Sequence, residues 1–244
     1  MAASVFDSAL LGPLFSPGEA GRLFTDSAEV RAMLLVEGAL ARVQGRLGVI
    51  PEVSAAAIRR ASMDIQLDPG ALAQATASNG VSVPALVSAF RAEMSAPEHA
   101  QYVHWGATSQ DIMDTGLMLQ LRDAEAVIAA RLEALADILT DHSVTHAATA
   151  MPGRTHGQHA QPVTFGYKTA IWLDEVRRHL TRLDEMRPRL LVGQFGGAVG
   201  TLAALGDQGF AVRALLMEKL ELGEPAITWH TSRDRLVEFV TTLA

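Results

Sequence analysis

Apolar residues recur at helical spacing through the first hundred residues of the chain. A polar start followed by apolar steps of three and four residues predicts a helix over residues 25–48, where a glycine ends it. A second helix is predicted over residues 54–61. Residues 72–94 have helical composition, with an interruption near Asn79-Gly80. This part of the chain is therefore expected to form several modest helices.

A longer helical pattern begins at Asp111. Its seam advances by alternating steps of four and three residues, through Ile128, Leu132, Leu135, Leu139, His142 and His146. No proline interrupts residues 111–150, which predicts one helix of roughly 60 Å at about 1.5 Å per residue. For His142 and His146 we favour a half-buried place in this seam over a metal site, because no third ligand follows at a recognisable spacing.

Further helices are predicted over residues 163–186, ending at Pro188, over about 200–220, and over 232–243. Long antiparallel helices with short links are typical of a bundle. The pattern predicts an all-α fold, with a smaller helical N-terminal domain over residues 1–105 and a long-helix bundle over 106–244. Because the chain stops within a periodic helix, we expect it to be a piece of a longer polypeptide.

Composition narrows the function classes. Aromatic residues make up only 5% of the chain, which favours helices over sheets, and the net charge of -7 argues against nucleic-acid binding. There are no cysteines, which excludes disulfides, thiolate zinc sites and cysteine nucleophiles. The charge-free runs are too broken to span a membrane, and residues 1–15 lack the basic region of a signal peptide. We expect a cytoplasmic protein.

Two segments combine polar residues suited to binding and proton transfer. The first, HWGATSQDIMDT at residues 104–115, places Thr108 and Ser109 at a predicted helix start, where free N–H groups and hydroxyls can hold a carboxylate. In isolation T-S-x-D would be an ordinary helix cap, but the preceding His-Trp-Gly favours a functional role. The second, residues 151–162, places Arg154, Thr155, His156, Gln158 and His159 in a link where a bundle needs only a short turn.

Two further segments carry weaker signals. GQFGGAVG at residues 193–200 is glycine-rich, but it follows a helix instead of a strand, so a dinucleotide site is not favoured. TWHTSRDR at residues 228–235 would by itself be a helix cap.

Taken together, HWGATSQDIMDT and GRTHGQHAQPVTFG resemble the signatures of the fumarase/aspartase superfamily, and the resemblance extends over essentially the whole chain. It implies a homotetramer with a helical core, active sites shared between subunits, a polycarboxylate substrate and no cofactor or metal. It also implies a third signature, a mobile loop carrying a serine base, beyond residue 244. A piece that ends at 244 is then expected to be inactive.

Two branches of the superfamily compete. The adenylosuccinate lyase branch shares G-R-T-H-G and the L-G-V-I-P turn at residues 47–51, but its basic R-Y-S and R-H-D-V stretches have no counterpart at residues 4–7 and 80–84. The 3-carboxy-cis,cis-muconate cycloisomerase branch is similar in QFGGAVGTLAALG at residues 194–206 and in TWHT at 228–231. These matches favour the cycloisomerase branch; adenylosuccinate lyase, or another fumarate-releasing lyase, is the alternative.

The resemblance implies a role for each candidate residue. Thr108 and Ser109 would bind one substrate carboxylate, Thr155 and Gln158 another, and His156 would transfer a proton or donate a hydrogen bond in the transition state. The cycloisomerase branch does not always keep histidine at this position, so the role of His156 is less firmly implied than in the lyases. A non-catalytic helical scaffold is the alternative from a different class.

Overall fold

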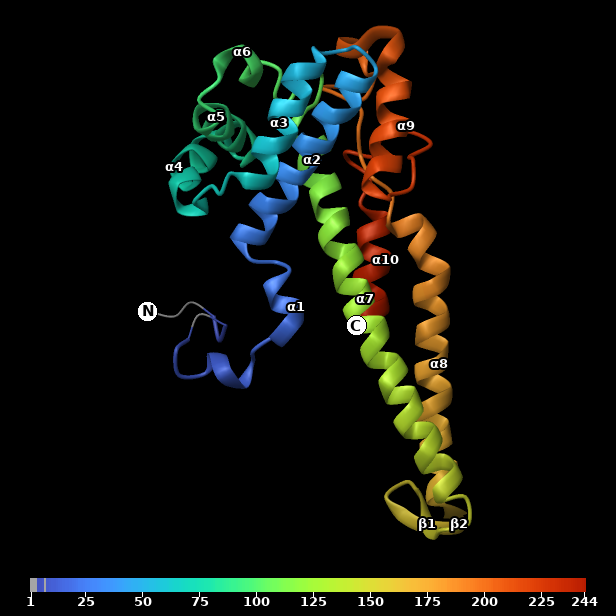
Figure 1. Ribbon diagram of the computed structural model, residues 1–244. Helices are drawn as coiled ribbons and strands as arrows, with labels where there is room; N and C mark the ends of the chain where they lie inside the picture. Colours follow the sequence, from blue (N-terminus) through green and yellow to red (C-terminus); the bar gives the residue numbers. More distant parts are fainter. Residues whose placement is uncertain (1–3, 7) are drawn as a thin grey trace. The chain divides into compact units, whose positions relative to one another are not determined.

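The computed structural model describes residues 4–6 and 8–244 and is built almost entirely of helices (Figure 1). Residues 1–3 and Asp7 lie outside the described residues. Asp7 belongs to the stretch that was compared with the R-Y-S segment, and residues 1–3 belong to the start that was compared with a signal peptide. The elements in chain order are η1 (Gly12–Leu14), α1 (Gly18–Arg22), α2 (Asp26–Arg46), α3 (Glu52–Asp64), α4 (Pro69–Asn79), α5 (Val83–Glu93), α6 (Pro97–Ala100), α7 (Ser109–Thr145), β1 (Ala150–Thr155), β2 (Gln158–Thr164), α8 (Phe165–Leu190), η2 (Ala203–Gln208), α9 (Gly209–Leu220) and α10 (Asp234–Leu243).

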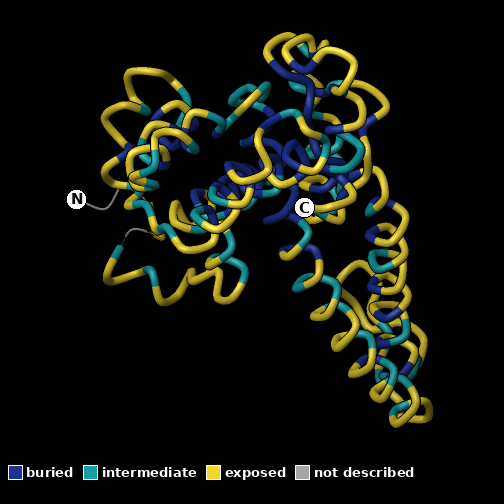
Figure 2. Tube along the Cα trace, turned by 45° about the horizontal axis from the view of Figure 1, so that its top comes forward, coloured by how far each residue is buried: buried dark blue, intermediate teal, exposed yellow. Residues whose placement is uncertain are grey.

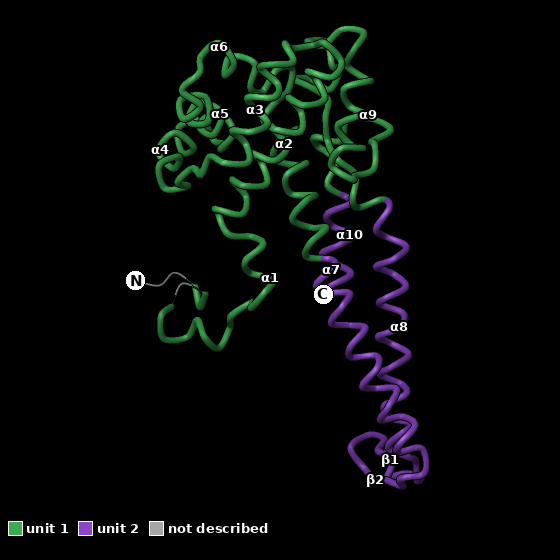
Figure 3. Tube along the Cα trace, viewed as in Figure 1, with its two compact units in different colours: residues 1–124, 189–233 green, residues 125–188, 234–244 purple. Residues whose placement is uncertain are grey.

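The chain divides into two compact units, which Figure 3 colours separately. Unit 1 comprises residues 1–124 and 189–233, and unit 2 comprises residues 125–188 and 234–244. The unit boundary at residue 124 falls inside α7. The predicted domain division at residue 105 remains a prediction about the full-length subunit.

Unit 1 is organised around α2. The Thr25 hydroxyl caps this helix by accepting from the N–H of Ala28 at 3.2 Å, which confirms the predicted helix start. More than half of the α2 residues are buried, because α3 and α9 pack against it (Figure 2). Gly38 permits the close approach of α3, since a Cβ there would overlap the side chain of Ser62. The predicted break at Asn79-Gly80 is also confirmed, with Gly80 at a φ of 77°.

Unit 2 holds the second half of α7, most of α8 and the hairpin of β1 and β2. Leu139, Leu173 and Val176 form its apolar cluster, with Leu132 and Leu180 packed against them. Within the predicted seam, Leu139 is buried and Leu135 is 41% exposed in the single chain. His142 is exposed instead of half-buried, and it stacks on His146, which lies just beyond the end of α7.

An ion pair stabilises the same unit. Glu125 is buried, and both of its carboxylate oxygens accept from the Arg187 guanidinium, at 2.7 and 3.1 Å. These hydrogen bonds raise the pKa of Arg187 above its ordinary value, and partial burial opposes the shift without cancelling it. Arg187 therefore stays charged throughout the physiological range.

The link between α7 and α8 is a two-stranded antiparallel hairpin, which the sequence pattern did not predict. Thr155 pairs with Gln158, so His156 and Gly157 form a two-residue loop. Both have positive φ, 50° and 74°, as a type I′ turn requires. Helix α8 also runs past Pro188 to Leu190, two residues beyond its predicted end, so Pro188 lies in the last turn of the helix.

Candidate active site

Asp111 organises the start of α7 in unit 1. Its carboxylate is fully buried and accepts five hydrogen bonds. Oδ2 accepts from the N–H groups of Thr108 (3.0 Å) and Gly197 (2.9 Å), and Oδ1 accepts from the N–H of Gly196 (2.8 Å), Nε2 of Gln194 (3.1 Å) and Nε2 of His230 (2.8 Å). The bond to Thr108 is one half of a capping box. One carboxylate thus joins the T-S-x-D segment, the glycine-rich segment and the Trp-His-Thr segment.

Neighbouring residues of α7 hold the same two segments in place. The Thr115 hydroxyl donates to the Gln194 carbonyl at 2.7 Å and accepts from its N–H at 2.9 Å. The side-chain oxygen of Gln194 accepts from the N–H of Trp229 at 2.7 Å. One turn from Asp111, the carboxylate of Asp114 binds Arg233 through both oxygens, at 2.7 and 3.1 Å. The backbone around Asp111 is therefore fixed from several sides.

His104 is held by a buried carboxylate. Glu37 of α2, 1% exposed, accepts from Nδ1 of His104 at 2.6 Å and from its backbone N–H at 3.1 Å. His104 adopts a φ of 65°, a conformation that is costly for a residue other than glycine. With Nδ1 engaged by Glu37, Nε2 is the nitrogen left for other partners. The arrangement fixes the orientation of the imidazole.

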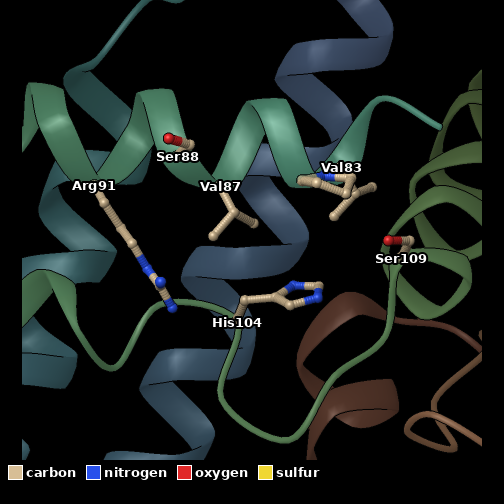
Figure 4. A pocket seen from close by; sticks show the side chains of 7 residues that line it. Val83, Val87, Ser88, Arg91, His104 and Ser109 are labelled. Carbon is tan, nitrogen blue, oxygen red and sulfur yellow. The ribbon is translucent and has the colours of Figure 1, made fainter. Parts of the chain in front are cut away.

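His104 and Ser109 line a cavity of about 360 Å³ within unit 1. Figure 4 shows Val83, Val87, Ser88 and Arg91 of α5 around it, with His104 and Ser109 contributed by the segment that leads into α7. The Arg91 guanidinium donates to the carbonyl of Val103 at 2.7 Å and has no carboxylate partner among the described residues. A cation, an imidazole and two hydroxyls beside an apolar wall suit an unsaturated carboxylate.

The Thr108 and Ser109 hydroxyls have no hydrogen-bond partner in the described part of the chain. The N–H of Thr108, just before the first helical residue Ser109, donates to Asp111, so it is not available to a ligand. Ser109 lines the cavity, whereas Thr108 does not. A carboxylate bound here would therefore be held mainly through the hydroxyls and the cavity donors.

The other three predicted residues belong to unit 2. Thr155, His156 and Gln158 lie at the turn of the hairpin, and all three are exposed. Thr155 lines a cavity of about 440 Å³ with Arg154 and Lys168. The turn holds the His156 imidazole in solvent, where no described residue accepts or donates a hydrogen bond to it. The predicted residues thus form two groups, one in each unit.

Sequence reasoning did not assign Glu37, Arg91, Gln194 or His230. A weak signal existed for the first two. Glu37 is a carboxylate in the apolar stripe of α2, and Arg91 follows Val83 and Val87 at four-residue steps on one face of α5. The segments around Gln194 and His230 were singled out in the sequence, but the hydrogen bonds of these two residues to Asp111 were not predictable, because they span 83 and 119 positions.

No group of three or more His, Asp or Glu residues in the described ranges could hold a metal ion. Similarly, none of the described helices combines the length and apolarity needed to cross a membrane.

Comparison with known proteins gives consistent matches. A family model described as "Lyase" matches residues 20–244. The chain is 50% identical over 223 residues to a 3-carboxy-cis,cis-muconate cycloisomerase of Pseudomonas aeruginosa, covering 91% of this chain and 49% of the relative. It is 40% identical over 210 residues to an adenylosuccinate lyase of Pyrococcus abyssi, covering 86% and 46%. The crystal structure of a 3-carboxy-cis,cis-muconate lactonizing enzyme from Pseudomonas putida superposes with a TM-score of 0.89 at 49% identity, covering 92% of this chain and 51% of that one. The chain spans about half the length of these relatives.

Proposed function

Because this chain belongs to the lyase family, of the fumarase/aspartase superfamily, we propose that the full-length protein is a 3-carboxy-cis,cis-muconate cycloisomerase. One observation carries the choice of branch. The two segments that resemble the cycloisomerases, around Gln194 and around His230, are hydrogen-bonded to Asp111 of the shared T-S-x-D signature. Identity to the relatives points the same way, at 50% for the cycloisomerase and 40% for the adenylosuccinate lyase.

The proposed reaction closes 3-carboxy-cis,cis-muconate to 4-carboxymuconolactone. An oxygen of one substrate carboxylate forms a C–O bond with an alkene carbon, the π electrons move to the neighbouring carbon, and that carbon takes a proton. Substrate and product are isomers apart from their protonation states, so no oxidant, reductant or cofactor is needed. The costly feature is the negative charge that develops on the carboxylate next to the protonated carbon, and positioned donors lower that cost.

Each candidate residue has a role in this proposal. Ser109 and Thr108 donate their hydroxyls to one substrate carboxylate, and Thr155 and Gln158 hold another. His156 transfers the proton or donates to the developing charge. The exposed, turn-held imidazole supports that role, because a group fixed at the end of a hairpin can enter a neighbouring subunit's site.

Assembly belongs to the proposal as well. We infer a cytoplasmic homotetramer with shared active sites. On unit 2, Ile138 is 54% exposed and Trp172 45% exposed, as expected of surfaces that another subunit covers. The domain division at residue 105 is likewise proposed for the full-length subunit.

The test is a side-by-side assay of full-length protein with 3-carboxymuconate and adenylosuccinate. We expect turnover of the first and none of the second. Cleavage of adenylosuccinate would contradict the branch assignment, and no turnover of any polycarboxylate would favour the scaffold alternative.

A further inference from the structure

A second cavity system of unit 1 is lined by cationic side chains. One cavity, of about 360 Å³, is bounded by α2, α3, α7 and α9 and is lined by Arg42, Arg59, Arg122 and Lys219. An adjoining cavity of about 380 Å³ shares Arg42 and Arg59 and adds Arg46. We call the two together the basic cavity. It shares no lining residue with the cavity of His104 and Ser109.

The charges of the basic cavity are poorly balanced. It holds five of the chain's 20 Lys and Arg residues, whereas two of the 27 acidic residues, Glu52 and Glu221, line it. The chain has a net charge of -7, so this positive cluster is opposite in sign to the charge of the whole chain. Like charges held around one concave surface repel each other. Arg42, Arg46, Arg59 and Lys219 are exposed, so solvent and salt screen this repulsion and can reach the cavity.

Most of these cations have no partner among the residues that the structure describes. Arg122 donates to the carbonyl of Leu220 at 2.9 Å and lies 3.6 Å from the carboxylate of Asp123. The side chains of Arg42, Arg46, Arg59 and Lys219 form no hydrogen bond or ion pair with any described residue.

Helix-end electrostatics account for only part of the cluster. Lys219 and Arg46 lie in the last turns of α9 and α2, where a cation offsets the helix dipole. Arg42 and Arg59 lie outside the last turns of α2 and α3. These two residues also line both cavities, so they form the centre of the cluster.

The remaining lining indicates the kind of ligand. Leu35, Leu119 and Met63 provide apolar surface beside the charges. Arginine forks bind carboxylates and phosphates through paired hydrogen bonds. We propose that the basic cavity binds a small organic anion with two or more negative groups and a short apolar body, held between Arg42 and Arg59.

Calorimetric titration of the full-length protein at low salt tests this assignment. Pyrophosphate represents a phosphorylated ligand and tricarballylate a polycarboxylate. The variant R42Q/R59Q removes the central charges, and R60Q is the matched control, because Arg60 is an exposed arginine of α3 that does not line the cavity. Tricarballylate could also bind at the candidate active site, but that binding would be the same in R42Q/R59Q and in wild type. Only the difference in binding between these two proteins therefore reports on the basic cavity.

We expect at least one probe to bind R42Q/R59Q at least about 10-fold more weakly than wild type, with R60Q unchanged. The probe that loses more identifies the ligand class. Equal binding by wild type and R42Q/R59Q would overturn the proposal, and so would an equal loss in R60Q. A change of oligomeric state in R42Q/R59Q, measured by sedimentation, would show that the cations face another subunit and would also overturn it.

Discussion

Replacing Asp111 by alanine should destabilise unit 1 by about 3–5 kcal/mol. The substitution leaves five donors without their acceptor, three of them backbone N–H groups of Thr108, Gly196 and Gly197. Each buried donor that loses its partner costs about 1–3 kcal/mol. The total stays below the sum of these costs, because water can enter the space that the carboxylate leaves. A loss of this size is a large share of the roughly 5–15 kcal/mol that holds most proteins folded.

The assay is urea unfolding of the 244-residue chain, followed by circular dichroism. The midpoint should fall with little change in slope, since the surface exposed on unfolding is nearly the same. Asp123→Ala is the control: this carboxylate is on the same helix, is exposed and has one ion pair, at 3.6 Å from Arg122. Such pairs contribute about 0–1 kcal/mol. If the two variants unfold at the same urea concentration, Asp111 does not join the three segments as described.

Four further predictions concern the full-length protein. His156→Asn removes the titratable ring and keeps a residue that tolerates the positive φ of this position. Turnover should fall about 10²–10⁴-fold while the melting temperature stays within about 2 °C. Near-normal turnover would refute proton transfer by His156. Ser109→Ala should raise KM about 10-fold with little change in kcat, because the hydroxyl binds a carboxylate present in ground and transition states alike; a loss confined to kcat would contradict this. Ile138→Glu should shift the sedimentation coefficient from tetramer towards smaller species, and an unaltered tetramer would exclude that surface from the interface. EDTA followed by dialysis should leave the rate unchanged; loss of activity restored by a divalent cation would show that a metal ion is required.

The helices were predictable where local signals decide them. The threonine cap and three-to-four-residue apolar spacing fix α2, and Gly80 separates α4 from α5. The hairpin was not predictable by the same means. Its strand residues are mostly exposed on both faces, so no alternation of apolar and polar residues marks them, and Pro152 and Pro162 obscure the pattern further.

The candidate site shows the same division. The place of Thr108 and Ser109 at a helix start was predictable because such a start has a local sequence pattern, and their binding role stays a prediction. The role of Asp111 as a common acceptor was not predictable, since its partners Gln194 and His230 are distant in the sequence. Helical periodicity cannot indicate which polar groups will meet across more than 80 residues. The exposed Leu135 has a related cause, because a seam read from one chain does not show which element covers it.

Proton NMR of the full-length protein with 3-carboxymuconate in D₂O tests whether the protein catalyses the proposed ring closure. We expect conversion to 4-carboxymuconolactone with one deuterium on the carbon next to the new C–O bond, and no fumarate at any time. Unchanged 3-carboxymuconate in the presence of folded, tetrameric protein, together with release of fumarate from adenylosuccinate, would contradict it.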